Sequence, residues 1–106
     1  MSGKKEYIYM LRLCERLSNG GAWTDEDDKA AFDHFERLRE MNAGGSLILA
    51  GRTQTRDSET FGLVIFEAAD DNEAEYIMKS DPAVAGGVMK SELFPYKVAL
   101  MRGVKD

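Results

Sequence analysis

Residues 46–68 read "SLILAGRTQTRDSETFGLVIFEA" and predict two neighbouring antiparallel strands in the middle of the chain. The two ends of this stretch, residues 46–53 and 60–68, are rich in strand-forming side chains. The polar run "QTRDSE" between them is short, as expected of the loop of a hairpin. The fold class then depends on the elements that flank this hairpin on each side.

A long helix is predicted before the hairpin, over residues 25–43. Thr24 is a typical N-cap, and Asp27 completes a Thr-x-x-Asp variant of the capping box. The acidic residues 25–28 favour this helix start through the helix dipole. Gly44 is expected to follow the helix as its C′ residue. Spacings of three and four define the face expected to point inward: Ala31, His34, Phe35, Leu38, Met41 and Asn42.

The remaining elements lie at the two ends of the chain. The nearly continuous apolar run over residues 6–14 predicts a strand buried on both faces, followed by a loop over residues 15–22. After the hairpin, residues 70–80 predict a second helix capped by Asp70 or Asp71, and residues 91–100 a last strand. The apolar side of this helix is expected to carry Ala74, Ile77 and Met78.

The resulting order, β-α-β-β-α-β, is that of an α+β ferredoxin-like fold. Right-handed crossovers predict an antiparallel four-stranded sheet in the order 4-1-3-2, with two helices on one face. Pro95 agrees with this order, because proline cannot donate to a ladder and strand 4 lies at an edge. The other face of the sheet stays uncovered, although the first strand is apolar on both sides. We therefore expect a homodimer that pairs through this open sheet face.

Composition limits the class of protein. The chain has 106 residues, which suits a single domain over residues 1–106. The net charge is −5, with scattered basic residues, and this disfavours nucleic acid as a partner. There is one cysteine, Cys14, and no apolar run or N-terminal segment typical of a membrane span or a signal peptide. A cytoplasmic protein without a membrane partner is the expectation.

No cofactor or metal site is expected. One histidine and one cysteine, about twenty positions apart, do not form a zinc site, and no glycine-rich phosphate loop follows a strand. Cys14, at a strand end, is expected to be packed rather than reactive.

His34 and Asp81 are the candidate catalytic residues. His34 is the only histidine, the side chain best suited to proton transfer near neutral pH, and a carboxylate partner would fix its tautomer. The alternative is a histidine at the border of the core that bonds a backbone carbonyl group. Asp81 precedes Pro82, so it is also a typical N-cap, and residues 81–87 would form one capped turn. The capping and catalytic roles are compatible, because a cap uses one carboxylate oxygen.

Three further side chains are candidates for substrate binding. Arg12 and Arg52 end or interrupt strands, and each would either bind an anionic substrate group or pair with a surface carboxylate. Trp23 precedes the helix cap, and it packs over a pocket mouth, at a subunit interface, or only against its own loop.

The ordered segments resemble the YciI-like (YCII-related) family over nearly the whole chain. The resemblance rests on "FDHFERLREM", "GGSLILAG", "FGLVIFEAADDNEAEYIMKSDPAVAGGV" and "LFPYKVAL". It implies a ferredoxin-like fold that dimerises as an α+β barrel, with a His-Asp active site formed by His34 and Asp81. It also implies that Gly51 and Pro82 shape the pocket.

The chain departs from the family pattern at two positions. Arg52 stands where the family often has proline after Ala-Gly, and Ala83 stands where an aromatic residue often follows Asp-Pro. The first departure adds a possible anion-binding group, and the second removes an aromatic wall.

Three functional hypotheses follow. The leading one is a cofactor-free enzyme acting on a small molecule, which uses His34 and Asp81 for proton abstraction followed by elimination or isomerisation. The alternatives are a non-catalytic dimeric module that binds or senses a small ligand, and a structural dimer without a specific ligand.

Overall fold

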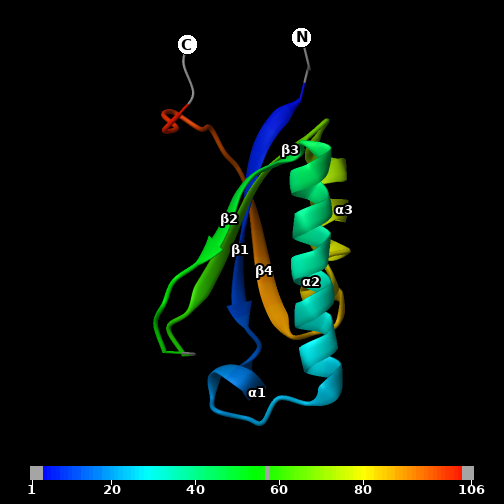
Figure 1. The fold of residues 1–106 in the computed structure, drawn as a ribbon, viewed down its shortest axis with the longest axis vertical. Helices are drawn as coiled ribbons and strands as arrows, with labels where there is room; N and C mark the ends of the chain where they lie inside the picture. The colour runs from blue at the N-terminus through cyan, green and yellow to red at the C-terminus, as the bar shows by residue number, and fades with distance from the viewer. Residues whose placement is uncertain (1–3, 57, 104–106) are drawn as a thin grey trace.

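A computed structural model describes residues 4–56 and 58–103 of the chain (Figure 1). Antiparallel strands form one sheet, and the two longer helices cover one of its faces (Figure 1). The elements in chain order are β1 (Lys5–Leu13), α1 (Glu15–Ser18), α2 (Asp25–Gly44), β2 (Leu47–Arg52), β3 (Phe61–Ala68), α3 (Asp71–Lys79), α4 (Pro82–Ala85) and β4 (Met89–Pro95).

The predicted topology is confirmed. The strands lie in the order β2-β3-β1-β4, which is the expected 4-1-3-2 order viewed from the other edge. All neighbouring pairs are antiparallel, and Pro95 ends the edge strand β4 opposite Tyr7 of β1. The fold is therefore the α+β ferredoxin-like arrangement.

The core lies between the sheet and the helices. Side chains alternate along a strand, so Tyr7, Tyr9 and Leu11 of β1 point toward the helices and are buried. Alternate residues of β3 do the same opposite them, and Leu38 of α2 closes this layer. The other buried members of the cluster are Val64, Phe66, Ala68, Ala74 and Met78.

The cap predicted for α2 is present, but its end lies one residue further along the chain. The Thr24 side chain accepts from the Asp27 backbone N–H, and the Asp27 carboxylate accepts from the Thr24 N–H. The helix continues through Gly44, and Gly45 takes the left-handed conformation, with φ of 88°. In a Gly-Gly pair either residue can adopt this conformation, so the sequence does not distinguish them.

The loop predicted over residues 15–22 is partly wrong, because its first four residues form α1. Leu17 is fully buried and anchors this single turn to the rest of the fold. Arg16 pairs with Asp27 at 2.8 Å and so connects α1 to the first turn of α2. A turn of four residues is too short to produce a recognisable helical period.

The predicted inward face of α2 is correct only in part. Leu38 is buried, whereas Phe35 is 55% exposed and Asn42 is exposed. Successive residues of a helix are 100° apart, so Phe35 lies at the edge of the stripe that His34 and Leu38 share.

The prediction that the first strand is buried on both faces holds only for its helix side in the single chain. Ile8 and Met10, on the other side of β1, stay partly exposed.

The last strand is shorter than predicted. β4 ends at Pro95, and the following segment leaves the edge of the sheet near Glu6, whose carboxylate accepts from the Val98 N–H at 2.9 Å. Residues 98–101 then lie against Ile48, Leu49 and Ile65 on the face of the sheet that the helices leave open.

None of the helices in residues 4–56 and 58–103 is long and apolar enough to cross a membrane.

Candidate active site

His34 and Asp81 meet, although 47 positions separate them. Nδ1 of His34 lies 2.8 Å from both carboxylate oxygens of Asp81. The His34 side chain is 14% exposed and that of Asp81 is fully buried. The partner of the histidine is therefore a carboxylate rather than the backbone carbonyl group that the alternative interpretation required.

Three groups donate hydrogen bonds to the Asp81 carboxylate. Besides His34, the Ala83 backbone N–H donates to Oδ1 at 2.9 Å, which makes Asp81 the N-cap of α4. The Tyr9 hydroxyl donates to Oδ2 at 2.6 Å from the sheet side. Capping and pairing with His34 thus coexist in one buried carboxylate.

The protonation states follow from these contacts. Burial raises the pKa of Asp81, but the hydrogen bonds from His34 and Tyr9 outweigh it and leave that pKa below its ordinary value. Burial and the negative charge of Asp81 raise the pKa of Tyr9, so the hydroxyl keeps its proton and remains a donor. Asp81 is therefore ionised and accepts from Nδ1–H of His34.

Close packing fixes the Asp81 turn against α2. A Cβ atom on Gly86 would lie 3.2 Å from Cβ of Ala30 and 2.9 Å from the Pro82 oxygen, so only glycine fits there without displacement. Arg37, three residues after His34 on α2, donates to the Ser80 carbonyl oxygen at 2.7 Å. Since Ser80 immediately precedes Asp81, this bond holds the backbone that carries the carboxylate.

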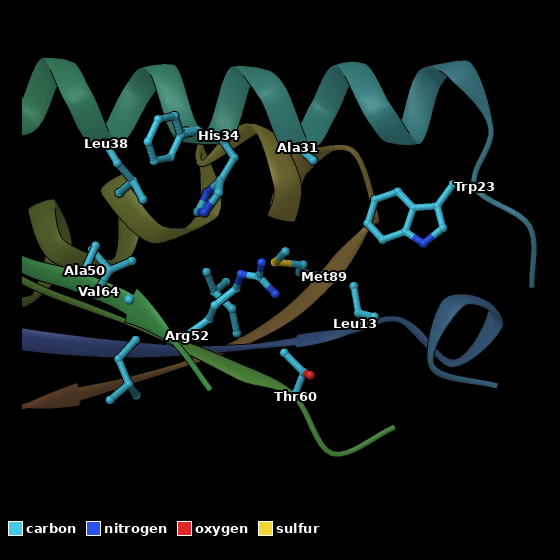
Figure 2. A pocket seen from close by; sticks show the side chains of 15 residues that line it. Leu13, Trp23, Ala31, His34, Leu38, Ala50, Arg52, Thr60, Val64 and Met89 are labelled. Atoms are coloured by element: carbon cyan, nitrogen blue, oxygen red, sulfur yellow. The ribbon is translucent and has the colours of Figure 1, made fainter. Parts of the chain in front are cut away.

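The second nitrogen of His34 remains free for chemistry. Nε2 has no hydrogen-bond partner among the described residues, and none of their buried side-chain nitrogens and oxygens lacks one. Nε2 must therefore be accessible to solvent. Figure 2 shows the His34 ring pointing from α2 into the space above the sheet.

A cavity of about 530 Å³ lies at this position, between α2 and the sheet. This volume falls in the range of small-molecule sites. Trp23 stands at one end of the cavity and Arg52 points into it from β2 (Figure 2). The lining is mainly apolar: Leu11, Leu13, Trp23, Ala31, His34, Phe35, Leu38, Ala50, Gly51, Arg52, Thr60, Gly62, Leu63, Val64 and Met89.

The structure brings some of the predicted binding residues to this cavity and leaves others elsewhere. Trp23, Gly51 and Arg52 line it. Arg12 extends from the other face of the sheet, where its guanidinium carbon lies 5.0 Å from the centre of the Phe61 ring. Pro82 begins α4 behind Asp81 and lies outside the lining.

Two positioning residues, Tyr9 and Arg37, are not predicted from the sequence. The tyrosine has the pattern of a core residue in a buried strand, and the arginine that of a charged residue on a helix. A weak signal for the tyrosine exists, because it alternates along the strand so that it shares one face with Tyr7. Over the described part of the chain, no group of three His, Cys, Asp or Glu side chains could hold a metal ion.

Known proteins support the fold and the family. The uncharacterized protein TM1266 from Thermotoga maritima is similar with a TM-score of 0.56 and 14% identity, over 89% of this chain and 99% of that one. The 5-chloro-2-hydroxyhydroquinone dehydrochlorinase TftG from Burkholderia phenoliruptrix, solved with 2,5-dihydroxybenzoquinone, has a TM-score of 0.53 and 15% identity, over 86% and 93%. No curated protein matches the chain. The family model of the YCII-related domain matches residues 9–97, and the chain therefore belongs to the YCII-related family.

Proposed function

We propose that this protein is an enzyme that removes a proton from a small molecule bound in the cavity, with His34 as the general base. One observation carries the proposal. Nδ1 of His34 is held by a buried carboxylate, while Nε2 has no partner in residues 4–56 or 58–103 and the ring lines a cavity of ligand size. A base oriented in this way meets the geometric requirement for general base catalysis.

The proton transfer needs only groups of this chain. Ionised Asp81 accepts from Nδ1–H, so the lone pair of the neutral ring lies on Nε2. When Nε2 takes a proton from the ligand, Asp81 stabilises the imidazolium that forms. Acid–base catalysis of this kind contributes roughly 10²–10⁴-fold to a rate.

Elimination or isomerisation would follow the abstraction. In an elimination from a chlorinated quinol, Nε2 takes the proton of one ring hydroxyl and the imidazolium returns it to the carbon that bears chlorine. Loss of a second hydroxyl proton then lets the electron pair of that O–H bond form the quinone carbonyl, while chloride departs with the pair of the C–Cl bond. In an isomerisation, the imidazolium returns the proton to another atom of the ligand. A dehydrochlorinase of the same fold, which by its name removes hydrogen chloride from its substrate, supports elimination as the first reaction to test.

The cavity favours a compact ligand with one ring. Its walls are mostly apolar, and His34, Arg52 and Thr60 supply most of the polar side-chain atoms. Such a lining would bind the apolar body of a ligand by burial and use the few polar groups to orient it.

The test replaces His34 by alanine and by glutamine. We expect kcat/KM on a ring-hydroxylated, ring-chlorinated substrate to fall roughly 10²–10⁴-fold in both variants. Asp33→Asn, at the neighbouring position of α2 where the side chain pairs with Lys29, is the matched control and should keep full activity. Chloride release and the absorbance of the quinone product measure turnover.

Full activity in either His34 variant would remove the histidine from the mechanism. Saturable ligand binding without any turnover, across a panel of quinols and their chlorinated forms, would favour the non-catalytic ligand-binding module instead.

We further infer that two copies pair through the open face of the sheet. The helices cover only one face (Figure 1), and the other carries apolar side chains from three neighbouring strands. These residues are Ile8, Met10, Leu63, Ile65 and Phe94. Burying this patch against a second copy would remove apolar surface from water.

A further inference from the structure

Arg52 is the residue at the cavity that the proposed proton transfer does not use. Side chains alternate along β2, so Ala50 and Arg52 share the side that lines the cavity. The guanidinium group extends into the space between the sheet and α2, the same space into which the His34 ring points (Figure 2). A ligand that reaches Nε2 of His34 therefore lies beside a positive charge.

That charge has no counter-ion within the described structure. Arg52 makes no ion pair or hydrogen bond with residues 4–56 or 58–103, in contrast to Arg16 and Arg37, whose guanidinium groups bond protein oxygens. Among the described residues, none of those that line the cavity carries a carboxylate. Asp81 is buried behind His34 and already accepts from three donors. Since arginine stays protonated, the cavity offers its ligand a cation that no described residue pairs with.

The surroundings of Arg52 suit a flat aromatic body. Trp23 and Phe35 provide aromatic walls, and Leu13 and Met89 add apolar surface. Gly62 lies opposite Arg52 on the neighbouring strand and adds no side chain to this part of the lining. A cavity of about 530 Å³ with these walls is of a size that suits a ligand with a single planar ring.

We propose that the ligand of this cavity is a single-ring aromatic carboxylate, and that Arg52 binds its carboxylate group. A guanidinium matches the two coplanar oxygens of a carboxylate with two parallel hydrogen bonds. The ring then occupies the apolar space and presents a proton to Nε2 of His34. This inference rests on the proposed function for the role of the histidine, but the preference for an anion requires no turnover.

The experiment compares two probes of nearly the same shape, the anion 2,5-dihydroxybenzoate and the neutral 2,5-dihydroxybenzamide, in which an NH2 group replaces one carboxylate oxygen. Trp23 is the only tryptophan and lines the cavity, so its fluorescence reports binding. We expect the wild-type protein to bind the carboxylate roughly 10- to 100-fold more tightly than the amide. Rising salt should weaken binding of the carboxylate and leave binding of the amide unchanged.

Variants locate the effect. Arg52→Gln should remove the preference for the carboxylate, and Arg52→Lys should retain only part of it, because lysine keeps the charge without the planar fork. Arg12→Gln is the matched control, since this arginine lies on the other face of the sheet, and it should keep the full preference. Equal affinity of the wild-type protein for both probes, no saturable binding at millimolar concentrations, or a preference that survives Arg52→Gln would each overturn the proposal.

The same measurements separate this inference from the proposed function. His34→Ala should keep the carboxylate preference while losing turnover. A preference for the carboxylate probe without any catalysis would support the role of Arg52 and refute the proposed enzymatic function. Catalysis that depends on His34 but shows no such preference would support the proposed function and refute the role of Arg52.

Discussion

At the scale of single residues, three side chains from separate elements form one hydrogen-bonded unit. His34 comes from α2, Asp81 from the start of α4 and Tyr9 from β1. The carboxylate at the centre is ionised because its donors outweigh its burial. The unit leaves Nε2 of His34 without a partner among the described residues, on a ring that lines the cavity.

The Tyr9 hydroxyl should influence the chemistry as a positioning group. Tyr9→Phe removes a donor from ionised Asp81, so the pKa of the Asp81 carboxyl group should rise. Unfolding free energy should fall by about 1.5–3 kcal/mol, as expected when a hydrogen bond to a charged group is lost. The acid limb of the kcat/KM profile against pH measures the first effect, and urea denaturation measures the second.

Tyr7→Phe is the control for this prediction. Tyr7 is also buried in β1, and its hydroxyl donates to Asp71 at 2.6 Å, away from His34. Both variants should lose stability, but only Tyr9→Phe should move the pH profile. An unmoved profile in Tyr9→Phe would reduce the tyrosine to a structural role.

Residue type and family resemblance together identify His34 and Asp81 from the sequence, but residue spacing alone does not predict their meeting. It depends on how α4 packs on α2, through Gly86 and Arg37. Tyr9 escapes prediction because a tyrosine in a central strand is indistinguishable from an ordinary core residue until its hydroxyl finds a partner.

At the scale of elements, α2 is the scaffold that carries the histidine, and its start is unusually well fixed. The Thr24–Asp27 capping box and the Arg16–Asp27 ion pair converge on one carboxylate. The hydrogen bonds from Arg16 and Thr24 lower the pKa of Asp27 from 3.8 to about 2. The start of the helix is thereby linked to α1.

This shift predicts how stability depends on pH. A carboxyl group with a depressed pKa in the folded state contributes stability above its unfolded value, here 3.8, and loses it as pH falls toward about 2. The wild-type protein should therefore melt at a higher temperature than Asp27→Asn above pH 4. That advantage should shrink between pH 4 and 2.

Asp28→Asn, in the same first turn, removes a carboxylate that has no such bonds and should lower the melting temperature less. Calorimetry at pH 5, 4, 3 and 2 on the three proteins makes the comparison. A difference between wild type and Asp27→Asn that stays constant over this range would contradict the assigned role of the carboxylate.

The sequence predicts an element correctly where it shows a periodic apolar pattern or a capping motif, and it fails where it shows neither. The hairpin strands, α3 with its Asp70 cap, and the start of α2 all follow from such patterns. The single turn α1 does not, because one buried leucine, Leu17, is enough to hold it. Between Gly44 and Gly45, backbone conformation alone decides which residue ends the helix.

At the scale of the whole molecule, the two faces of the sheet differ in what covers them. The helix side contains the core and the cavity, and the opposite side presents an apolar surface. Residues 98–101 lie at one end of that surface, against Leu49 and Ile65. The sequence predicts the strand order and the placement of both helices on one face of the sheet, but it does not predict the path of this segment.

The proposed dimer can be tested on both faces. Met10→Lys places a charge in the open face beside Leu63, so we expect the variant to elute as a single chain and the wild type with twice that mass. Tyr76→Lys is the control, because Tyr76 is 69% exposed on α3, on the helix side, and its replacement should leave the mass unchanged. Light scattering coupled to size exclusion measures the masses, and a wild-type protein of single-chain mass would refute the pairing.

The position of Asp81 at the head of α4 restricts what evolution can place there. Asparagine or serine would still cap the turn but would offer the imidazole no negative charge. Glutamate would supply that charge but is a poor capping residue, and its longer side chain would have to be accommodated in a fully buried site. Aspartate alone satisfies both demands, so this position should tolerate no substitution for as long as the histidine serves as a base.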